Sequence, residues 1–540
     1  MVELEPALKA IAEQIERGED LDGAARRLGE ILAATPGNAQ ALQLAGAAAF
    51  RRQDFAGAEE YFRRAARAAP DDAGSANNLG QALRAQDKIS EARAEFWRAM
   101  ALDNVFAEPA MNLGLMAAAD GHWADAIEFY ARALCRRINF AEAHFNWAIA
   151  LERLGEPEGA IGHYRRAIQF RPAYMQAINN LGVLLDDAGR HQEAEALFRE
   201  GLAQDDGVAE LWSSLGSNLR AQGQLDAASE AHGRALALRP DFPKCRWNLA
   251  LLQLAEGEFG EGWANYRYRP SAERGATPFP GVPWADHQPG AAVNVRGEQG
   301  LGDELYFLRF VRELAVRGVK ARYAGDARLR PLLRRLDFVE VADLSDGGDW
   351  VSAADLPYLL SARSAPASIR LDAEPAHLAR MRARLAEAGP PPYLGITYRA
   401  GIKQPGSLYK EISIDALAVA IRNYPGTIVN LQRAPGAGEG DALRAALGGE
   451  AADFTACNDD LEDMLALMAL IDHLAGVSNT NMHLRAAAGR QALVLVTHPA
   501  EYRWMAAGDS SPWFPDFRLF RQAADGTWDA ALDNLRRELP

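Results

Sequence analysis

Cysteine and long apolar runs are both scarce in this chain of 540 residues. The three cysteines, Cys135, Cys245 and Cys457, lie far apart and share no metal-ligand spacing. This excludes a disulfide-stapled secreted domain and a cysteine zinc site. No apolar run approaches the ~20 residues of a membrane-spanning helix, and the first residues do not have the basic and apolar pattern of a secretory signal. We therefore expect a cytoplasmic protein without a transmembrane segment.

Positive charge is also in short supply. The chain has 58 Lys and Arg against 73 Asp and Glu, a formal net charge of −15, and both halves are acidic. An acidic protein repels the phosphate backbone, so we expect no nucleic-acid partner, although a local basic pocket for a phosphate is still allowed. Hydrophobic residues make up 49% of the chain, which excludes disorder over most of its length.

A repeat of 34 residues fills the N-terminal half. Three columns recur at this spacing: one of small residues, one of alanine and one of rings. The small column is Gly46, Gly80, Gly114, Ala148, Gly182, Gly216 and Ala250. The alanine column is Ala58, Ala92, Ala126, Ala160, Ala194 and Ala228, followed by Gly262. The ring column is Phe62, Phe96, Tyr130, Tyr164, Phe198, His232 and Tyr266.

The columns predict pairs of antiparallel helices, because small residues allow two helices to approach and a ring fills the space beside them. The pattern resembles tetratricopeptide repeats. We expect a repeat superhelix over residues 36–271, preceded by a degenerate capping repeat over residues 1–35. The fold class is thus an α solenoid followed by an α/β part.

A polar column lies two residues before each small position. Its members are Asn78, Asn112, Asn146, Asn180, Ser214 and Asn248. An asparagine amide both donates and accepts hydrogen bonds, so such a ladder is able to hold an extended peptide backbone. A similar ladder occurs in the repeat domain of O-linked N-acetylglucosamine transferases. The alternative is that each asparagine supports the neighbouring helix.

The 34-residue repeat ends near residue 272, and the sequence pattern changes. Residues 272–291 are rich in Pro and Gly and read as a linker. Short apolar runs then alternate with amphipathic stretches, which predicts a parallel sheet covered on both faces. The expected strands are 292–296, 320–324, 338–342, 393–398, 427–431, 473–477 and 492–496, and the expected helices include 305–316, 376–388, 414–422, 461–471 and 528–538. Three consecutive prolines at 390–392 divide the region into lobes of residues 292–389 and 390–540, with a cleft between them.

Ligands bind beyond the carboxyl ends of parallel strands, near helix N-termini. The first such loop holds Gly300, Gly302 and Asp303. Asp303 is a candidate general base facing the cleft; the alternative is an N-cap of the following helix. The second loop holds Arg399 and Lys410, whose charges suit an anion.

The third loop holds Ser478, Asn479, Thr480 and, one turn later, His483. Its polar side chains and the N-terminus of the following helix form a candidate phosphate-binding site. The alternative is that these residues are a cluster of helix caps. His483 either faces the cleft or packs internally. Residues 501–522 are dense in aromatic residues and arginine. We expect them to form a core between the lobes rather than to stack on a ligand.

Together these loops resemble the two-lobed GT-B glycosyltransferases of the lipopolysaccharide heptosyltransferase type, and bacterial proteins that join such a domain to tetratricopeptide repeats. The resemblance implies that Asp303 is the catalytic base. It also implies that Gly300, Gly302, Arg399, Lys410, Gln432, Ser478, Asn479, Thr480 and His483 bind a nucleotide sugar. The family's aspartate and threonine are replaced here by Ser478 and Asn479, so we expect one carboxylate to be lost from the pocket.

Two functions follow. The first is an inverting glycosyltransferase that needs no metal and no cofactor beyond its nucleotide-sugar co-substrate, and that modifies a protein acceptor held by the repeats. The alternative is a non-catalytic protein-binding scaffold with a degenerate glycosyltransferase fold. The sequence leaves the sugar, the acceptor and the oligomeric state open.

Overall fold

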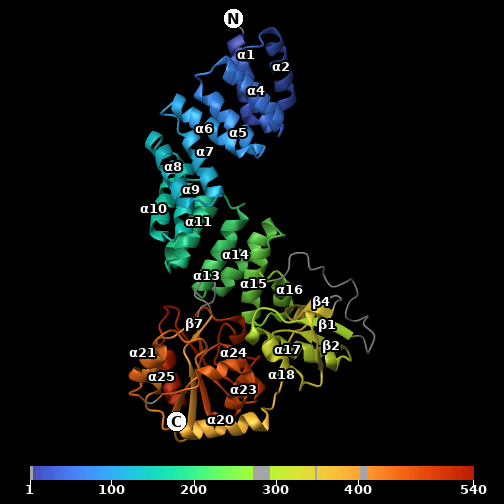
Figure 1. The fold of residues 1–540 in the computed structure, drawn as a ribbon, viewed down its shortest axis with the longest axis vertical. Coiled ribbons are helices and arrows are strands. Elements are labelled where there is room, and N and C mark those ends of the chain that lie inside the picture. The colour runs from blue at the N-terminus through green and yellow to red at the C-terminus, as the bar shows by residue number, and fades with distance from the viewer. Residues whose placement is uncertain (1–3, 272–291, 347–349, 402–409, 450) are drawn as a thin grey trace. The chain divides into compact units, whose positions relative to one another are not determined.

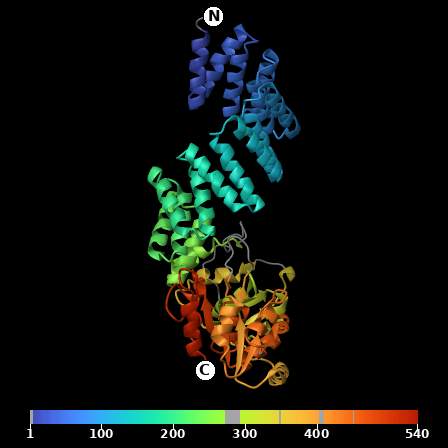
Figure 2. The same cartoon turned by 90° about the vertical axis from the view of Figure 1, so that its left-hand side faces the viewer.

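The computed structural model describes residues 4–271, 292–346, 350–401, 410–449 and 451–540 (Figure 1; turned by 90° in Figure 2). The linker expected at 272–291 therefore lies outside the described residues. The chain divides into two compact units, residues 1–188 and 189–540. This division falls inside the predicted repeat region. Among the described helices, none combines the length and apolar character needed to cross a membrane.

The first unit consists of antiparallel helix pairs. Its helices are α1 (Leu4–Arg17), α2 (Leu21–Ala34), α3 (Ala39–Arg51), α4 (Phe55–Ala68), α5 (Ala73–Ala85), α6 (Ile89–Leu102), α7 (Glu108–Ala119), α8 (Trp123–Arg136), α9 (Ala141–Leu154), α10 (Pro157–Phe170) and α11 (Met175–Asp187). The second unit begins with α12 (His191–Gln204), α13 (Ala209–Ala221), α14 (Leu225–Leu238), α15 (Pro243–Glu256) and α16 (Phe259–Tyr266). The predicted α solenoid is confirmed.

The small and ring columns meet inside each helix pair. A Cβ added to Gly80 would lie 2.7 Å from Cε1 of Phe96, and one added to Gly216 would lie 2.7 Å from Cε1 of His232. Real Cβ atoms do not approach other atoms so closely, so at Gly80 and Gly216 a side chain would fit only if the ring of the second helix moved. The physical reason given for the repeat pattern is therefore confirmed.

The second unit continues with two parallel sheets. The first has the order β3-β2-β1-β4. Its elements are β1 (Ala292–Arg296), α17 (Leu301–Val316), β2 (Lys320–Ala324), α18 (Arg330–Leu333), β3 (Val339–Val341), β4 (Trp350–Ser352) and α19 (Leu356–Leu359).

The second sheet has the order β12-β11-β10-β5-β8-β9 and is parallel throughout. Its strands are β5 (Tyr393–Thr397), β8 (Thr427–Asn430), β9 (Ala451–Asp453), β10 (His473–Val477), β11 (Leu493–Val496) and β12 (Arg518–Arg521). The short antiparallel pair β6 (Arg399–Ala400) and β7 (Lys410–Glu411) stands apart from it. The chain starts in the middle at β5 and winds outward in both directions, so β5 and β10 flank a switch point in strand order.

Helices cover both faces of the second sheet (Figure 1). The helices of this region are α20 (Pro375–Ala388), α21 (Ile414–Ile421), α22 (Glu439–Ala446), α23 (Leu461–Leu470), α24 (Thr480–Ala487) and α25 (Asp529–Glu538). Buried residues of α21, α22 and α25 share one hydrophobic cluster, and those of α20, α23 and α24 share another. Alternate strand residues supply the two clusters: Leu493 and Leu495 belong to the first, and Val494 and Val496 to the second.

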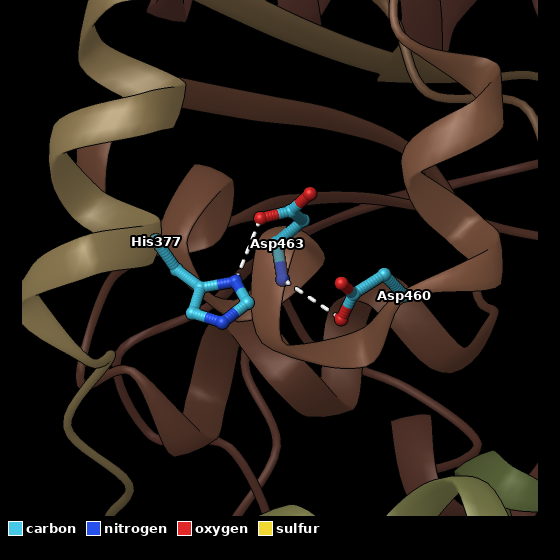
Figure 3. A group of neighbouring side chains, drawn as sticks. All are labelled: His377, Asp460 and Asp463. Carbon is cyan, nitrogen blue, oxygen red and sulfur yellow. Dashed lines mark hydrogen bonds and ion pairs between the residues drawn. The ribbon is translucent and has the colours of Figure 1, made fainter.

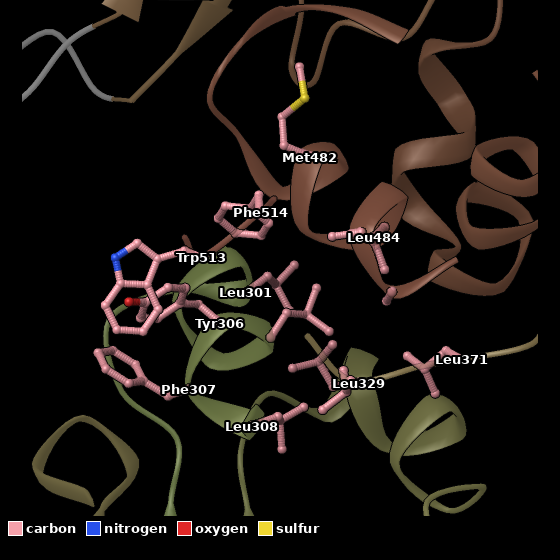
Figure 4. Close-up of a cluster of buried hydrophobic side chains, with 14 of the residues drawn as sticks. Leu301, Tyr306, Phe307, Leu308, Leu329, Leu371, Met482, Leu484, Trp513 and Phe514 are labelled. Carbon is pink, nitrogen blue, oxygen red and sulfur yellow. The ribbon is translucent and has the colours of Figure 1, made fainter. Parts of the chain in front are cut away.

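One buried core joins the end of the repeats to both sheets. Trp263 and Tyr266 of α16 belong to the same cluster as Phe307 of α17 and Trp513. Figure 4 shows Tyr306 and Phe307 of α17 beside Trp513 and Phe514. The aromatic segment 501–522 thus has the core role expected from the sequence. The helix α20, placed by the sequence in the first lobe, packs against α23 beside the second sheet.

Candidate functional site

A cavity of about 360 Å³ lies at the carboxyl ends of β1, β5, β8 and β10, within the second unit. The structure brings every one of the residues predicted for the α/β site into its lining. These are Asp303, Gly300, Gly302, Arg399, Lys410, Gln432, Ser478, Asn479, Thr480 and His483. Parallel sheets present their ligand-binding loops at this edge, which explains why loops far apart in sequence meet here.

Two helices begin at this cavity and approach one another closely. A Cβ added to Gly302, in the first turn of α17, would lie 3.1 Å from Cδ2 of His483 on α24. Asn479 caps α24, where its side chain accepts a hydrogen bond from the backbone N–H of Asn481. The capping interpretation of this loop is thus confirmed for Asn479, and Gly302 permits the close contact.

Asp303 does not cap α17. The N-cap residue of that helix is Gly300, and Asp303 lies in its first turn. The carboxylate of Asp303 instead forms an ion pair with Arg503, whose side chain is 8% exposed. The N-cap alternative is therefore wrong: the helix begins three residues earlier than a cap at 303 requires, and Asp303 lines the cavity.

Arg503 also pairs with Glu501, and Glu501 binds Lys410. The Lys410 Nζ donates to Oε2 of Glu501 at 2.7 Å and to the carbonyl of Ser478 at 3.3 Å. Burial alone would raise the pKa of Glu501, but the charges of Lys410 and Arg503 outweigh it and lower that pKa to about 2. The anionic form of Glu501 is thus fixed between two cations.

The Ser478 hydroxyl donates to the same Glu501 Oε2 at 3.4 Å. Glu501, 23 residues further along the chain, thus places a buried carboxylate beside Ser478, although it is not among the described residues that line the cavity. The loss of a carboxylate from the pocket itself stays a prediction. Sequence reasoning missed Glu501 and Arg503 as site residues. They sit in the aromatic stretch assigned to the core, and only the fold places them against the loops.

Gln432 ties the walls of the cavity together. It is 1% exposed, and its side-chain oxygen accepts from the backbone N–H groups of Tyr398 and Arg399, each at 3.0 Å. Its Nε2 donates to the carbonyls of Arg399 and Arg433 at 2.9 Å. The amide is fully used in these four bonds, so its role here is to hold the loop after β5. Arg399 donates to Glu439 at 2.9 Å.

Among the cavity-lining side chains of the third loop, two polar atoms lack a partner in the part of the chain that the structure describes. They are Nδ2 of Asn479 and Nδ1 of His483, both buried. Burial and the charge of Arg503 lower the pKa of His483 well below its usual value, so the imidazole is neutral. Buried polar atoms are rarely left unsatisfied, and these two lie on side chains that line the cavity.

A separate group, His377, Asp460 and Asp463, has the composition of a metal site (Figure 3). Figure 3 shows the ring of His377 on α20 turned toward Asp463 on α23, at 2.8 Å. Arg380 donates to Asp463 through Nε at 3.1 Å, and Asp460 caps α23. The carboxylate of Asp463 thus already has a cationic partner in Arg380, and Asp460 serves as a helix cap.

The asparagine column makes hydrogen bonds inside the repeats. In the first unit, Asn112 is buried and donates to Asn77 at 3.0 Å, Asn146 donates to the Glu142 carbonyl at 2.8 Å, and Asn180 donates to the Tyr164 hydroxyl at 3.3 Å. These bonds fit the helix-supporting interpretation.

Two further asparagines of the column are Asn78 and Asn248. Asn78 lines a cavity of about 150 Å³ with Phe50, Arg51 and Gln81. In the second unit, Asn248 donates to the Ser217 hydroxyl at 2.9 Å.

Comparison with known proteins identifies the repeats. Family models described as tetratricopeptide repeat match residues 16–73, 145–209 and 73–102. The matched helices are thus tetratricopeptide repeats, and such repeats typically bind protein or peptide partners.

Relatives cover parts of the chain. Protein FlbA of Caulobacter vibrioides is 26% identical over 420 residues, covering 64% of this chain and 69% of that protein. The crystal structure of YrrB, described as a TPR protein with an unusual peptide-binding site, is 21% identical, covers 35% of this chain and 96% of its own, and has a TM-score of 0.31. MamA is 25% identical, covers 30% and 95%, and has a TM-score of 0.27.

Proposed function

We propose that this tetratricopeptide-repeat chain acts first as a protein-binding scaffold. The family matches of the repeats support this function, and the comparisons support it better than they support group transfer. The partner is an extended peptide segment, because the half-buried amides of Asn146 and Asn180 recur at one repeat spacing. Each uses one bond of its Nδ2 within its own repeat, and the other groups of the amide are able to bond peptide groups of any sequence.

A peptide-binding assay tests the scaffold. Fluorescence anisotropy with a labelled pool of twelve-residue peptides of random sequence measures binding to the chain, to the variant Asn146→Ala/Asn180→Ala, and to Asn534→Ala, an exposed control on α25. We expect the double variant to bind at least tenfold more weakly and the control to match the parent. Equal affinity of all three would show that the asparagines serve only the helices.

We propose glycosyl transfer as a second function, on account of the cavity at the strand ends. One observation carries it: loops from two parallel sheets, each wound outward from its middle strands, meet at a single cavity with Lys410, Asp303 and the N-terminus of α24 in its lining. This arrangement supports a GT-B-like fold with a nucleotide sugar as ligand. The buried atoms Asn479 Nδ2 and His483 Nδ1 would gain partners from the bound diphosphate or sugar.

The proposed reaction uses the residues as follows. Asp303 accepts the proton of an acceptor hydroxyl, whose oxygen attacks the anomeric carbon from the side opposite the diphosphate, so the configuration inverts. Negative charge develops on the departing diphosphate, where Lys410 and the first N–H groups of α24 stabilise it. Asp303 has to exchange its contact with Arg503 for the acceptor hydroxyl during this step.

Donor hydrolysis separates the two functions. Release of nucleoside diphosphate from a panel of nucleotide sugars is measured for the parent, for Asp303→Asn and for Asp337→Asn, an exposed control. Transfer predicts release that falls at least a hundredfold in Asp303→Asn and is unchanged in the control. Equal release by parent and Asp303→Asn would contradict the role of Asp303. Calorimetry that detects no binding of any nucleotide sugar would leave the scaffold function alone.

A further inference from the structure

A second cavity, of about 150 Å³, lies within the second unit where the last repeats meet the second sheet. The turn after α13, the helix α15 and the segments after β11 and β12 form its walls. Its polar side chains are Arg220, Thr497, His498, Arg521 and Gln522, and no aspartate or glutamate lines it. The whole chain has a formal net charge of −15, but this wall has two guanidinium groups and no carboxylate, so its local charge is positive.

Arg220 is the cation of this wall for which the described residues provide no side-chain hydrogen bond or ion pair. It lies in the last turn of α13 and is half-buried. Burial lowers its pKa, and no neighbouring carboxylate contributes to the shift. Burial, reinforced by the charge of Arg220, lowers the pKa of His232 to about 4, so this ring is neutral and adds no second positive charge beside Arg220. A desolvated cation without a counter-charge is costly.

Three other polar groups of the wall, on Arg521, His498 and Gln522, are already bonded. Arg521 donates to four backbone carbonyls, those of Trp504, Met505, Ala507 and Gly508, at 2.6–2.9 Å. The His498 ring lies 3.0 Å from the Ala221 carbonyl, and Gln522 accepts from the His498 backbone N–H at 3.0 Å. These bonds hold the wall in place around Arg220, so a ligand would meet a preformed site.

We propose that this cavity binds a small oxyanion, a phosphate or carboxylate group, through the guanidinium of Arg220. The planar N–H groups of arginine match two oxygens of such a group. The volume admits an ion of this size and is below the roughly 300 Å³ at which pockets for larger ligands begin. The site is distinct from the cavity with Lys410 and does not depend on glycosyl transfer.

Thermal unfolding with inorganic phosphate tests the proposal. The Lys410→Gln variant serves as the background, so that phosphate at the other cavity contributes little. A ligand that binds the folded state raises its melting temperature. We expect phosphate to raise the melting temperature of Lys410→Gln and to leave that of Lys410→Gln/Arg220→Gln unchanged. The matched control is Lys410→Gln/Arg518→Gln, in which the exposed Arg518 is replaced instead of Arg220, and phosphate should raise its melting temperature as it does for Lys410→Gln. Succinate in a parallel series distinguishes a carboxylate from a phosphate ligand.

Two further readouts exclude a purely structural role of Arg220. Without added anion, Arg220→Gln should melt at the same or a higher temperature than the parent, because an unpaired cation has been removed; a lower temperature would oppose the proposal. Crystals of the parent soaked in sodium tungstate should show an anomalous peak at the Arg220 guanidinium. The absence of that peak, or an equal phosphate response with and without Arg220, overturns the proposal.

Discussion

Lys410 and Glu501 lie 91 residues apart in the chain, yet the Lys410 Nζ lies 2.7 Å from Glu501 Oε2. The same carboxylate group pairs with Arg503, which in turn pairs with Asp303. Each predicted functional charge of the cavity therefore has an internal counter-charge. The diphosphate of the proposed nucleotide sugar would have to compete with Glu501 for Lys410, so the carboxylate would set the affinity of the cavity for that anion.

We expect Glu501→Gln to bind nucleoside diphosphates about tenfold more tightly than the parent. The substitution removes the negative charge beside Lys410, the cation that would contact the diphosphate. A tenfold change in affinity corresponds to about 1.4 kcal/mol of binding free energy. Titration calorimetry with UDP and GDP measures the effect. Glu411→Gln, on the adjacent exposed side chain, is the control and should match the parent. Weaker binding by Glu501→Gln would mean that Glu501 orients Lys410 rather than competing for it.

Arg503→Gln should destabilise the second unit by about 3–5 kcal/mol. Its side chain is 8% exposed and pairs with Asp303 and Glu501, so its removal leaves carboxylates without their buried partner. Urea unfolding followed by tryptophan fluorescence measures the loss. The exposed Arg518 provides the control, since Arg518→Gln should change stability by less than about 0.5 kcal/mol. The double variant Arg503→Gln/Glu501→Gln should recover part of the lost stability, because it also removes a carboxylate left without its partner. A double variant as unstable as Arg503→Gln would contradict this explanation.

The repeat region was predictable because its chemistry is local and periodic. The small residue and the ring of each unit lie 16 residues apart in the sequence, as Gly80 and Phe96 do, and the same contact recurs along the chain. The strand starts were also predictable, since apolar runs such as 292–296 and 473–477 coincide with β1 and β10. The short strands β4, β9 and β12 were missed because they carry few apolar residues or lie in the aromatic stretch.

The site was predictable only in its loops. Sequence position relative to a strand end identifies Ser478 and Lys410 as neighbours of one sheet edge, since all parallel strands end there. It does not identify Glu501 or Arg503, because their contacts depend on how the segment after β11 folds back across the cavity. The sequence likewise does not show that the Gln432 amide makes four hydrogen bonds to the backbone, because these bonds depend on three-dimensional contacts.

Gly80→Ala should lower stability by about 1–3 kcal/mol, because its Cβ would meet the Phe96 ring at 2.7 Å and crowding of a packed core is costly. Gly162→Ala is the matched control: it lies within α10, and its Cβ would meet nothing within 4 Å. The control should be stabilised by about 0.5–1 kcal/mol through helix propensity. Thermal unfolding followed by circular dichroism compares the two. Similar shifts in both would show that Phe96 yields easily, and Gly80→Ala/Phe96→Leu should restore the parent's stability.

The first unit should lose stability below pH 6.5 through His163. Its ring stacks on Trp147 with centroids 4.2 Å apart and lies 3.1 Å from the His144 ring between Nδ1 atoms. Burial, then the charges of His144 and Arg166, lowers the pKa of His163 from 6.5 to about 4. The unfolded chain therefore binds the proton first, so the contribution is complete above pH 6.5 and falls as the pH drops from 6.5 to 4.

The lost stability is about 2 kcal/mol after allowance for the partial exposure of the ring. Melting temperatures measured from pH 7.5 to 4.5 report it. His163→Phe keeps a ring against Trp147 and cannot be protonated, so its melting temperature should fall less steeply than that of the parent. The exposed His122 gives the control, His122→Phe, which should retain the parent's slope. If His163→Phe also retains that slope, protonation of His163 contributes nothing to the loss of stability in acid, and the acid sensitivity arises elsewhere in the chain.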